Sequence, residues 1–129
     1  MNKPEQLFEL ARKASQNAYA PYSKFKVGAA ILTTTGRFYA GCNVENISYP
    51  NGTCAETGAI SAMIAGADTQ IAAILIYADS KFLITPCGAC RQRIAEFSAP
   101  NTVIYLSNKD GIQQEHTVAE LLPESFKEF

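Results

Sequence analysis

The sequence lacks long hydrophobic runs, clusters of positive charge and all but one histidine. No stretch approaches the roughly 18 consecutive apolar residues of a membrane span. The first residues, MNKPEQ, also lack the apolar run and cleavage site of a signal peptide. We therefore expect a cytoplasmic protein that does not bind a membrane. The single histidine, His116, argues against a Ser-His or multi-histidine catalytic site.

Charge of either sign is modest, with 11 Lys and Arg residues against 12 Asp and Glu residues. Nucleic-acid affinity comes largely from Lys and Arg that displace counterions, so this balance argues against a nucleic-acid partner. A substrate should be small and not strongly anionic. With 129 residues, of which 47% are hydrophobic, residues 1–129 are expected to form one domain.

Hydrophobic periodicity and turn residues predict an alternation of helices and strands. The pattern indicates an α/β fold, a three-layer α/β/α sandwich in which helices cover both faces of a mixed sheet. Gly36 supplies the positive φ angle of a hairpin turn. The predicted helices are residues 4–17, 54–65 and 87–97, and the predicted strands are residues 24–33, 37–43, 71–78, 102–106 and 112–118.

Three of the four cysteines have positions that suit one metal ion. Cys87 and Cys90 can both reach an ion from the first turn of a helix, and Cys54 also opens a predicted helix. Free amides and the positive dipole end of a helix N-terminus favour the thiolate that zinc requires. Three protein ligands leave the fourth tetrahedral position open, as in catalytic zinc sites.

Glu56 lies two residues after Cys54, where its carboxylate can contact a water at the open position without binding the metal. Cys-Ala-Glu followed by Pro-Cys-x-x-Cys is typical of zinc-dependent base deaminases, in the variant where Cys replaces His. Either short motif alone would be a weak signal. Both together, each opening a helix, favour a deaminase.

With these motifs the chain resembles the small cytidine deaminases of the three-cysteine zinc type, a family that forms homotetramers. The resemblance covers about residues 19–126. The matching segments are residues 19–25 (YAPYSKF), 27–30 (VGAA), 41–46 (GCNVEN), 54–56 (CAE), 86–92 (PCGACRQ) and 120–123 (ELLP).

The resemblance implies a mixed five-stranded sheet, one Zn²⁺ per chain and a tetramer in which neighbouring subunits complete each active site. Asn43 and Glu45 match the positions that hold the ribose hydroxyls. Phe25 matches an aromatic residue packed against the pyrimidine ring. Tyr49 and Phe126 match residues that reach into a neighbouring subunit's pocket.

The expected reaction is the hydrolysis of cytidine, and of deoxycytidine, to uridine or deoxyuridine plus ammonia in pyrimidine salvage. Glu56 would move the protons to N3 and to the leaving amino group. By resemblance, the Ala55 amide would bind the 2-oxo group and the Thr85 carbonyl would accept from the amine. Independently of the family, Asn43 and Glu45 lie at alternate positions after a strand and therefore point to the same side.

The sequence departs from the family at Thr57, where an Arg commonly offsets the thiolate charges. Three thiolates on a divalent ion leave a net negative site. Arg91, directly after Cys90, is the candidate for this charge tuning, together with the two helix dipoles.

Other interpretations stay open at this point. Cys87-Gly-Ala-Cys90 also suits a thioredoxin-type dithiol, and Cys42 could complete a structural four-cysteine zinc site. A deaminase of a cytosine-containing antibiotic such as blasticidin S would share the zinc motif. Without the matched segments, Phe25 would be assigned to the core and Glu45 to a solvated loop.

Overall fold

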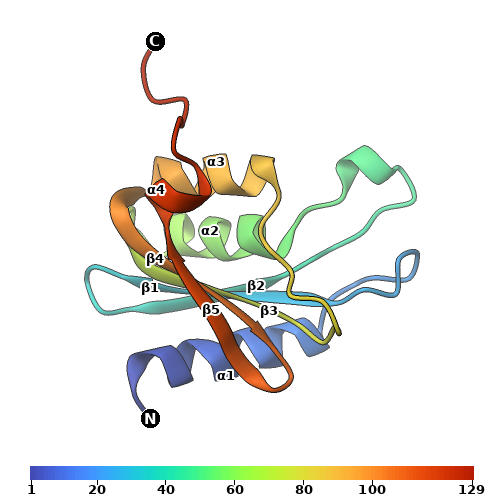
Figure 1. The fold of residues 1–129 in the computed structure, drawn as a ribbon. Coiled ribbons are helices and arrows are strands. Elements are labelled where there is room, and N and C mark those ends of the chain that lie inside the picture. The colour runs from blue at the N-terminus through green and yellow to red at the C-terminus, as the bar shows by residue number, and fades with distance from the viewer.

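Residues 1–129 are described by a computed structural model, in which five strands form one mixed sheet in the order β2-β1-β3-β4-β5. Figure 1 shows α1 on one face of this sheet and α2, α3 and α4 on the other. The elements are α1 (Lys3–Gln16), β1 (Val27–Thr33), β2 (Phe38–Cys42), η1 (Tyr49–Asn51), α2 (Ala55–Ala65), β3 (Ile71–Ala78), α3 (Gly88–Glu96), β4 (Ser98–Asn108), β5 (Gly111–Thr117) and α4 (Val118–Leu121). This arrangement confirms the predicted three-layer α/β/α sandwich with a five-stranded mixed sheet.

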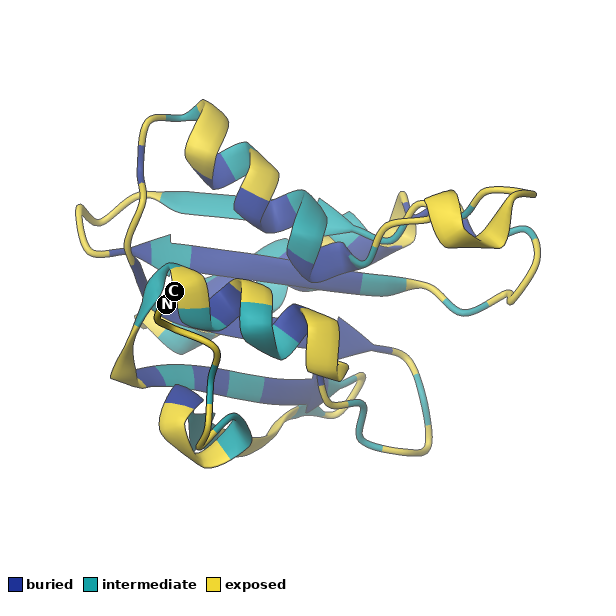
Figure 2. Ribbon diagram, turned by 90° about the horizontal axis from the view of Figure 1, so that it is seen from above, coloured by how far each residue is buried: buried dark blue, intermediate teal, exposed yellow.

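The central strand β3 is buried on both faces, as its uninterrupted apolar run predicts (Figure 2). It pairs antiparallel with β1 and parallel with β4. The parallel pair requires a crossover connection, which α3 provides. Because α3 follows β3 directly, the segment that carries Cys87 and Cys90 begins at the carboxyl end of the central strand.

Two apolar cores lie on opposite faces of the sheet. The larger core joins α2 and α3 to the sheet, and the smaller core joins α1 to it. The larger contains Ala29, Ile31, Ala55, Ala59, Ile60, Met63, Ile71, Ile74, Ile76, Ile94, Ile104, Leu106 and Val118. The smaller contains Leu7, Ala11, Ala30, Ala73, Leu75 and Tyr77.

The close packing of α2 against β2 depends on Gly41. A Cβ atom at this position would lie 2.3 Å from the backbone nitrogen of Ala59 in α2. Any larger residue would therefore displace the helix whose first turn carries Glu56. The hairpin glycine predicted from the sequence, Gly36, has a φ of 88° at the β1–β2 turn, as expected.

The structure also contains elements that the sequence did not predict correctly. Strand β4 runs over Ser98–Asn108 instead of the predicted residues 102–106. The short helix α4 was not predicted at all. Its start is fixed by a capping box in which the Thr117 side chain accepts from the Glu120 amide and the Glu120 side chain accepts from the Thr117 amide.

Asp68 ties the turn after α2 to the β1–β2 hairpin. The Thr35 hydroxyl donates to one carboxylate oxygen at 2.7 Å and the Tyr39 hydroxyl donates to the other at 2.8 Å. Arg37 lies 3.8 Å from the same carboxylate. The hydrogen bonds from Thr35 and Tyr39 lower the pKa of Asp68, with the charge of Arg37 acting in the same direction.

We expect Asp68→Asn to remove a pH-dependent part of the free energy of unfolding. A carboxyl group whose pKa is lowered by folding contributes stability above its unfolded pKa of about 3.9, and this contribution is lost as the pH falls through the folded pKa. Urea unfolding between pH 2 and 7 should therefore show a shallower acid limb in Asp68→Asn than in wild type. The matched control is Asp110→Asn, in the exposed β4–β5 turn. An acid limb unchanged by Asp68→Asn would contradict the assignment.

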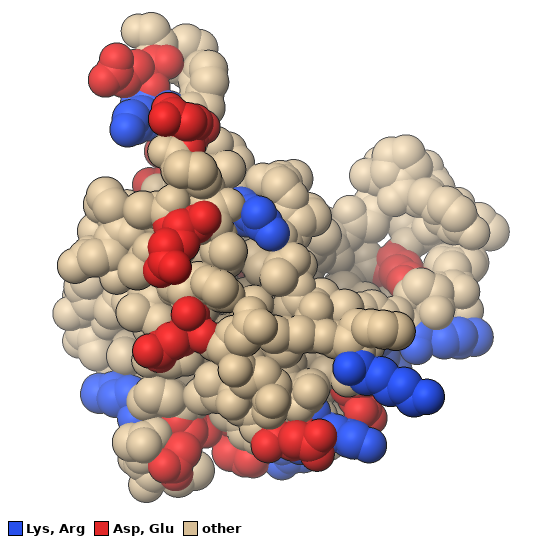
Figure 3. Space-filling model, in the orientation of Figure 1, with Lys and Arg blue, Asp and Glu red and all other residues tan.

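No helix is long and apolar enough to span a membrane. On the face shown in Figure 3, acidic and basic side chains are interspersed, without a basic patch.

Candidate active site and metal centre

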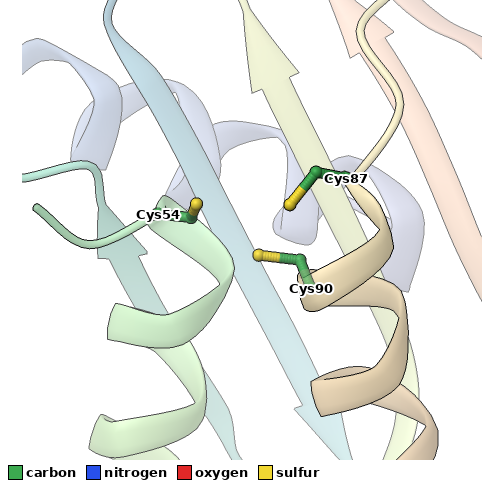
Figure 4. A group of neighbouring side chains, drawn as sticks. All are labelled: Cys54, Cys87 and Cys90. Carbon is green, nitrogen blue, oxygen red and sulfur yellow. The ribbon is translucent and has the colours of Figure 1, made fainter. Parts of the chain in front are cut away.

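The thiols of Cys54, Cys87 and Cys90 meet between the starts of two helices (Figure 4). Cys54 is the N-cap residue of α2, Cys87 is the N-cap residue of α3, and Cys90 lies in the first turn of α3. All three sulfur atoms lie within 4.8 Å of one another. Residues far apart in the sequence are thus brought together as the helix-start pattern predicts.

The geometry of this cluster suits zinc. A tetrahedral ion with Zn–S bonds of about 2.3 Å holds its sulfur ligands about 3.8 Å apart. This separation fits three sulfur atoms that all lie within 4.8 Å of one another. All of the cysteines are free, so the cluster is not a disulfide. Cys42 is not part of the cluster, and its absence from the group excludes the four-cysteine site considered above.

The local environment of the thiols also favours a cation. Burial is the main cause that raises the pKa of Cys54 and of Cys90. At Cys87 the backbone amide of Cys90 is the main cause that lowers the pKa. Thiolates at Cys54 and Cys90 are costly next to other negative charges, and a divalent ion among the three sulfur atoms offsets this cost.

Glu56 lies in the first turn of α2, two residues after the ligand Cys54, and only 5% of its surface is exposed. Burial raises the pKa of its carboxyl group. A buried carboxyl group with a raised pKa, next to a metal site, has the properties of a general acid and base.

Glu56 and two of the thiols line a cavity of about 330 Å³ that lies over the carboxyl end of β3. Four other predicted substrate-binding residues line the same cavity: Asn43, Glu45, Ala55 and Thr85. Its full lining is Val27, Asn43, Val44, Glu45, Gly52, Thr53, Cys54, Ala55, Glu56, Ile76, Ile84, Thr85 and Cys87. The structure thus places two of the proposed zinc ligands, the proposed proton carrier and the predicted sugar-binding pair around one volume, with the third thiol, Cys90, fully buried within 4.8 Å of the other two.

Asn43 and Glu45 are fixed by the chain that precedes β1. Asn43 accepts from the Val27 amide at 2.9 Å and donates to the Phe25 carbonyl at 2.8 Å. Glu45 accepts from the amides of Tyr22 and Ser23 at 3.0 and 3.1 Å, and from the Ser23 hydroxyl. Each side chain keeps further donor or acceptor capacity. They therefore have fixed positions and can still bind hydroxyl groups.

The other three predicted substrate contacts lie outside this cavity. Phe25 is half-buried. Tyr49 is 74% exposed and lies in an adjoining hollow that also contains Tyr22 and Glu45. Phe126 is 63% exposed on the C-terminal tail, where its backbone exchanges two hydrogen bonds with the Gln92 side chain, at 2.8 and 3.1 Å. The roles of these three residues stay predictions.

Arg91 does not point its donors at the thiols. Its guanidinium donates to the carbonyls of Pro86 and Leu121 at 2.8 and 3.1 Å, and to the Thr85 hydroxyl at 3.3 Å. These contacts hold the Thr85–Pro86 segment at the cavity wall and join it to α4. Charge tuning by Arg91 stays a prediction, but the contacts describe a residue that positions Thr85.

Sequence reasoning missed Arg93. Its guanidinium nitrogen Nη1 lies 3.8 Å from the Cys90 sulfur. The available signal was the spacing, because residues three apart on a helix lie on the same face. Arg93 is the arginine that contacts the ligand set.

Thr57, the departure from the family pattern, has the one buried side-chain oxygen or nitrogen atom in the chain without a hydrogen-bond partner. An unpaired buried hydroxyl costs about 1–3 kcal/mol. We expect Thr57→Val, which keeps the shape and removes the hydroxyl, to raise Tm by about 3–5 °C for each kcal/mol recovered. Thermal unfolding of Thr57→Val and of the hydroxyl-retaining control Thr57→Ser checks this. A lower Tm in Thr57→Val than in Thr57→Ser would mean that the hydroxyl makes a stabilising contact.

A three-thiolate zinc site at two helix starts, with a buried carboxylate beside it in an α/β/α sandwich, defines the class of zinc-dependent deaminases. A family model described as "Cytidine and deoxycytidylate deaminase zinc-binding region" matches residues 1–106. This match covers the four cysteines, Glu56, Asn43 and Glu45. The chain belongs to this deaminase family.

Individual relatives agree with this assignment. A cytidine deaminase from Sporosarcina psychrophila is 44% identical over 122 residues, which cover 95% of this chain and 90% of that protein. The crystal structure of cytidine deaminase from Burkholderia pseudomallei matches with a TM-score of 0.90 at 41% identity, over 98% of this chain and all of that one. The crystal structure of cytidine deaminase from Mycobacterium tuberculosis matches with a TM-score of 0.84 at 32% identity, over 99% and 100% of the two chains.

Proposed function

We propose that this protein hydrolyses cytidine to uridine and ammonia, accepts deoxycytidine as well, and serves pyrimidine salvage in the cytoplasm. The observation that carries the proposal is a cluster of three thiols, two of which, Cys54 and Cys87, line one cavity of about 330 Å³ together with the buried Glu56 carboxylate. This volume lies in the range of small-molecule sites, about 300–1,000 Å³. A free nucleoside suits such a cavity better than a polymer does.

The positions of the polar residues set the orientation of the nucleoside. The base lies toward Glu56 and the thiols, and the sugar lies toward Asn43 and Glu45. A fixed amide and carboxylate favour ligands with matching hydroxyls, because these positioned polar groups would otherwise lose hydrogen-bond partners. Within a polynucleotide the 3′ oxygen of the sugar is esterified and cannot donate to Glu45. This arrangement supports a nucleoside over the antibiotic alternative.

Cys54, Cys87 and Cys90 would hold a zinc ion, which would supply the Lewis acidity that makes water a nucleophile at neutral pH. The Glu56 carboxylate takes a proton from the attacking water and gives it to N3 of the cytosine ring, which makes C4 electrophilic. The water oxygen bonds to C4, Glu56 then carries the remaining proton of this C4 hydroxyl to the amino group, and the C4–N bond breaks. One water is consumed, and uridine and ammonia are released.

Backbone groups orient the ring. Ala55 is the first residue of α2, so its amide has no partner within the helix and can donate to the 2-oxo group. Thr85 lines the cavity, and its carbonyl can accept from the amino group. Arg91 contacts the Thr85 hydroxyl and the Pro86 carbonyl. These two contacts hold the Thr85 carbonyl in place.

The proposal includes one domain over residues 1–129 and a homotetramer, with Tyr49 and Phe126 entering a neighbour's site. Both side chains are more than half exposed. The C-terminal tail that follows α4 stands away from the body in Figure 1. Phe25 would pack against the pyrimidine ring. Sedimentation velocity of the protein tests the tetramer, and a monomer that turns over cytidine at full rate would contradict this part.

The test of the proposed function is the ultraviolet change on mixing zinc-assayed protein with cytidine, deoxycytidine or blasticidin S. Conversion of the two nucleosides, with one zinc per chain, supports the proposal. Conversion of the antibiotic alone would replace it with the antibiotic deaminase. A zinc-loaded protein inert toward all three would leave a non-enzymatic zinc domain, and a zinc-free protein with redox-active thiols would restore the dithiol interpretation.

A further inference from the structure

Arg93 differs from the other arginines of the chain in what its guanidinium contacts. Arg12 pairs with Glu9, Arg37 with Asp68, and Arg91 donates to three oxygen atoms. Arg93 has no oxygen acceptor and no ion pair. Its one polar contact is the Cys90 sulfur, at 3.8 Å from Nη1.

The ligand set is where a positive charge is needed. Three thiolates exceed the charge of a divalent ion, and the buried Glu56 adds another negative charge beside them. Cys90 is fully buried, so water does not solvate its sulfur. An electrostatic contact with this sulfur is screened less than one between two surface groups.

The other candidate groups near the thiols do not supply this positive charge. Thr57 carries no charge, and the Arg91 donors are directed at carbonyls and a hydroxyl instead of sulfur. The contact with Cys90 therefore places the positive charge of Arg93 at the ligand set.

The position of Arg93 on α3 also has an ordinary explanation. It lies in the last turn, where a basic side chain is favourable to the helix dipole without any link to a metal. That explanation predicts a small effect on stability and none on metal affinity. The directed contact with Cys90 instead predicts a large effect on metal affinity and none on the stability of the metal-free protein.

We propose that Arg93 is a positioning residue of the metal centre, whose guanidinium holds the Cys90 thiolate and offsets part of the negative charge of the ligand set. Groups in direct contact with metal ligands are typically worth 10- to 100-fold in metal affinity. The inference rests on the zinc site of the proposed function. Its test needs no nucleoside, so its failure is distinguishable from a failure to deaminate cytidine.

The experiment is a competition for zinc between the protein and a chromogenic chelator at fixed pH. Arg93→Met keeps the aliphatic stem and removes the charge, and we expect it to bind zinc about 10- to 100-fold more weakly than wild type. Arg93→Lys should recover part of this loss. The thiolate-to-cobalt absorption of the cobalt-substituted protein should shift in Arg93→Met. Arg12→Met, which removes a half-buried arginine on α1, outside the thiol cluster, is the control and should bind zinc as wild type does.

Thermal unfolding in excess chelator separates this role from a structural one. Wild type and Arg93→Met should then have the same Tm. The proposal is overturned if Arg93→Met binds zinc as tightly as wild type. It is also overturned if Arg93→Lys loses as much affinity as Arg93→Met, or if Arg93→Met lowers Tm equally with and without zinc.

Discussion

Glu56→Gln is expected to lower kcat for cytidine by about 10²- to 10⁴-fold, the range that a general acid and base contributes. The glutamine amide has nearly the same shape as the carboxylate and cannot accept a proton from water or deliver one to N3. Glu56 is not part of the metal-binding cluster, which consists of three cysteine thiols, so the variant should keep one zinc per chain. Initial rates at 280–290 nm and metal analysis of the same sample measure both quantities.

The control for this variant is Glu96→Gln, which changes an exposed carboxylate at the end of α3. It should retain wild-type kcat and zinc content. If Glu56→Gln lost its zinc along with its activity, Glu56 would be part of the metal-binding shell. If it kept full activity, proton transfer would have to be assigned to another group.

The metal cluster could be predicted from the sequence because its geometry depends on local structure. Cys87 and Cys90 share the first turn of one helix, and Cys54 caps another, so helix starts alone place their thiols. The only long-range requirement is that the two helix starts meet. They do so because both helices pack on one face of the same sheet.

The side-chain contacts around the cluster could not be predicted in the same way. Arg91 follows a ligand directly, but its guanidinium turns toward the Leu121 carbonyl of α4, a helix that periodicity did not reveal. The guanidinium of Arg93 contacts Cys90, which lies three residues before it on the same helix. Which of two nearby arginines contacts a ligand depends on tertiary packing, whereas the residue spacing permits either one.

The predicted sugar-binding residues, Asn43 and Glu45, could be predicted in part: less completely than the thiol cluster and better than the arginine contacts. Alternation after a strand predicts that Asn43 and Glu45 share a side, and both line the cavity. The sequence did not indicate that they are held by the segment before β1, through the Phe25 carbonyl and the Tyr22 and Ser23 amides. This segment thus has a structural task in addition to the proposed contact of Phe25 with the base.

Cys87→Ala is expected to abolish zinc binding and turnover without harm to the fold. Cys87 is exposed, and as the N-cap residue of α3 its side chain makes no capping hydrogen bond. Its removal therefore takes away a metal ligand but no packing and no cap. Zinc affinity should fall by more than the 10- to 100-fold typical of groups outside the ligand set. Chelator competition and cytidine turnover measure the loss.

The matched control is Cys42→Ala, since Cys42 is also a free cysteine but lies outside the cluster. It should retain zinc and activity, with a stability change of about 1 kcal/mol or less. Loss of zinc in both variants would point to a fourth thiol ligand. Retention of zinc in Cys87→Ala would mean that this thiol is not a ligand.

Thermal stability provides a second and independent measure of zinc binding through Cys87. Zinc that binds only the folded chain adds about 2.7 kcal/mol to the free energy of unfolding at 100 times its Kd. The Tm of wild type should therefore drop when a chelator removes the metal, whereas the Tm of Cys87→Ala should be the same with and without chelator. Because the Cys87 side chain is exposed and makes no capping hydrogen bond, wild type and Cys87→Ala should unfold at the same temperature in excess chelator. A lower Tm for Cys87→Ala in excess chelator would show that the thiol stabilises the start of α3 on its own.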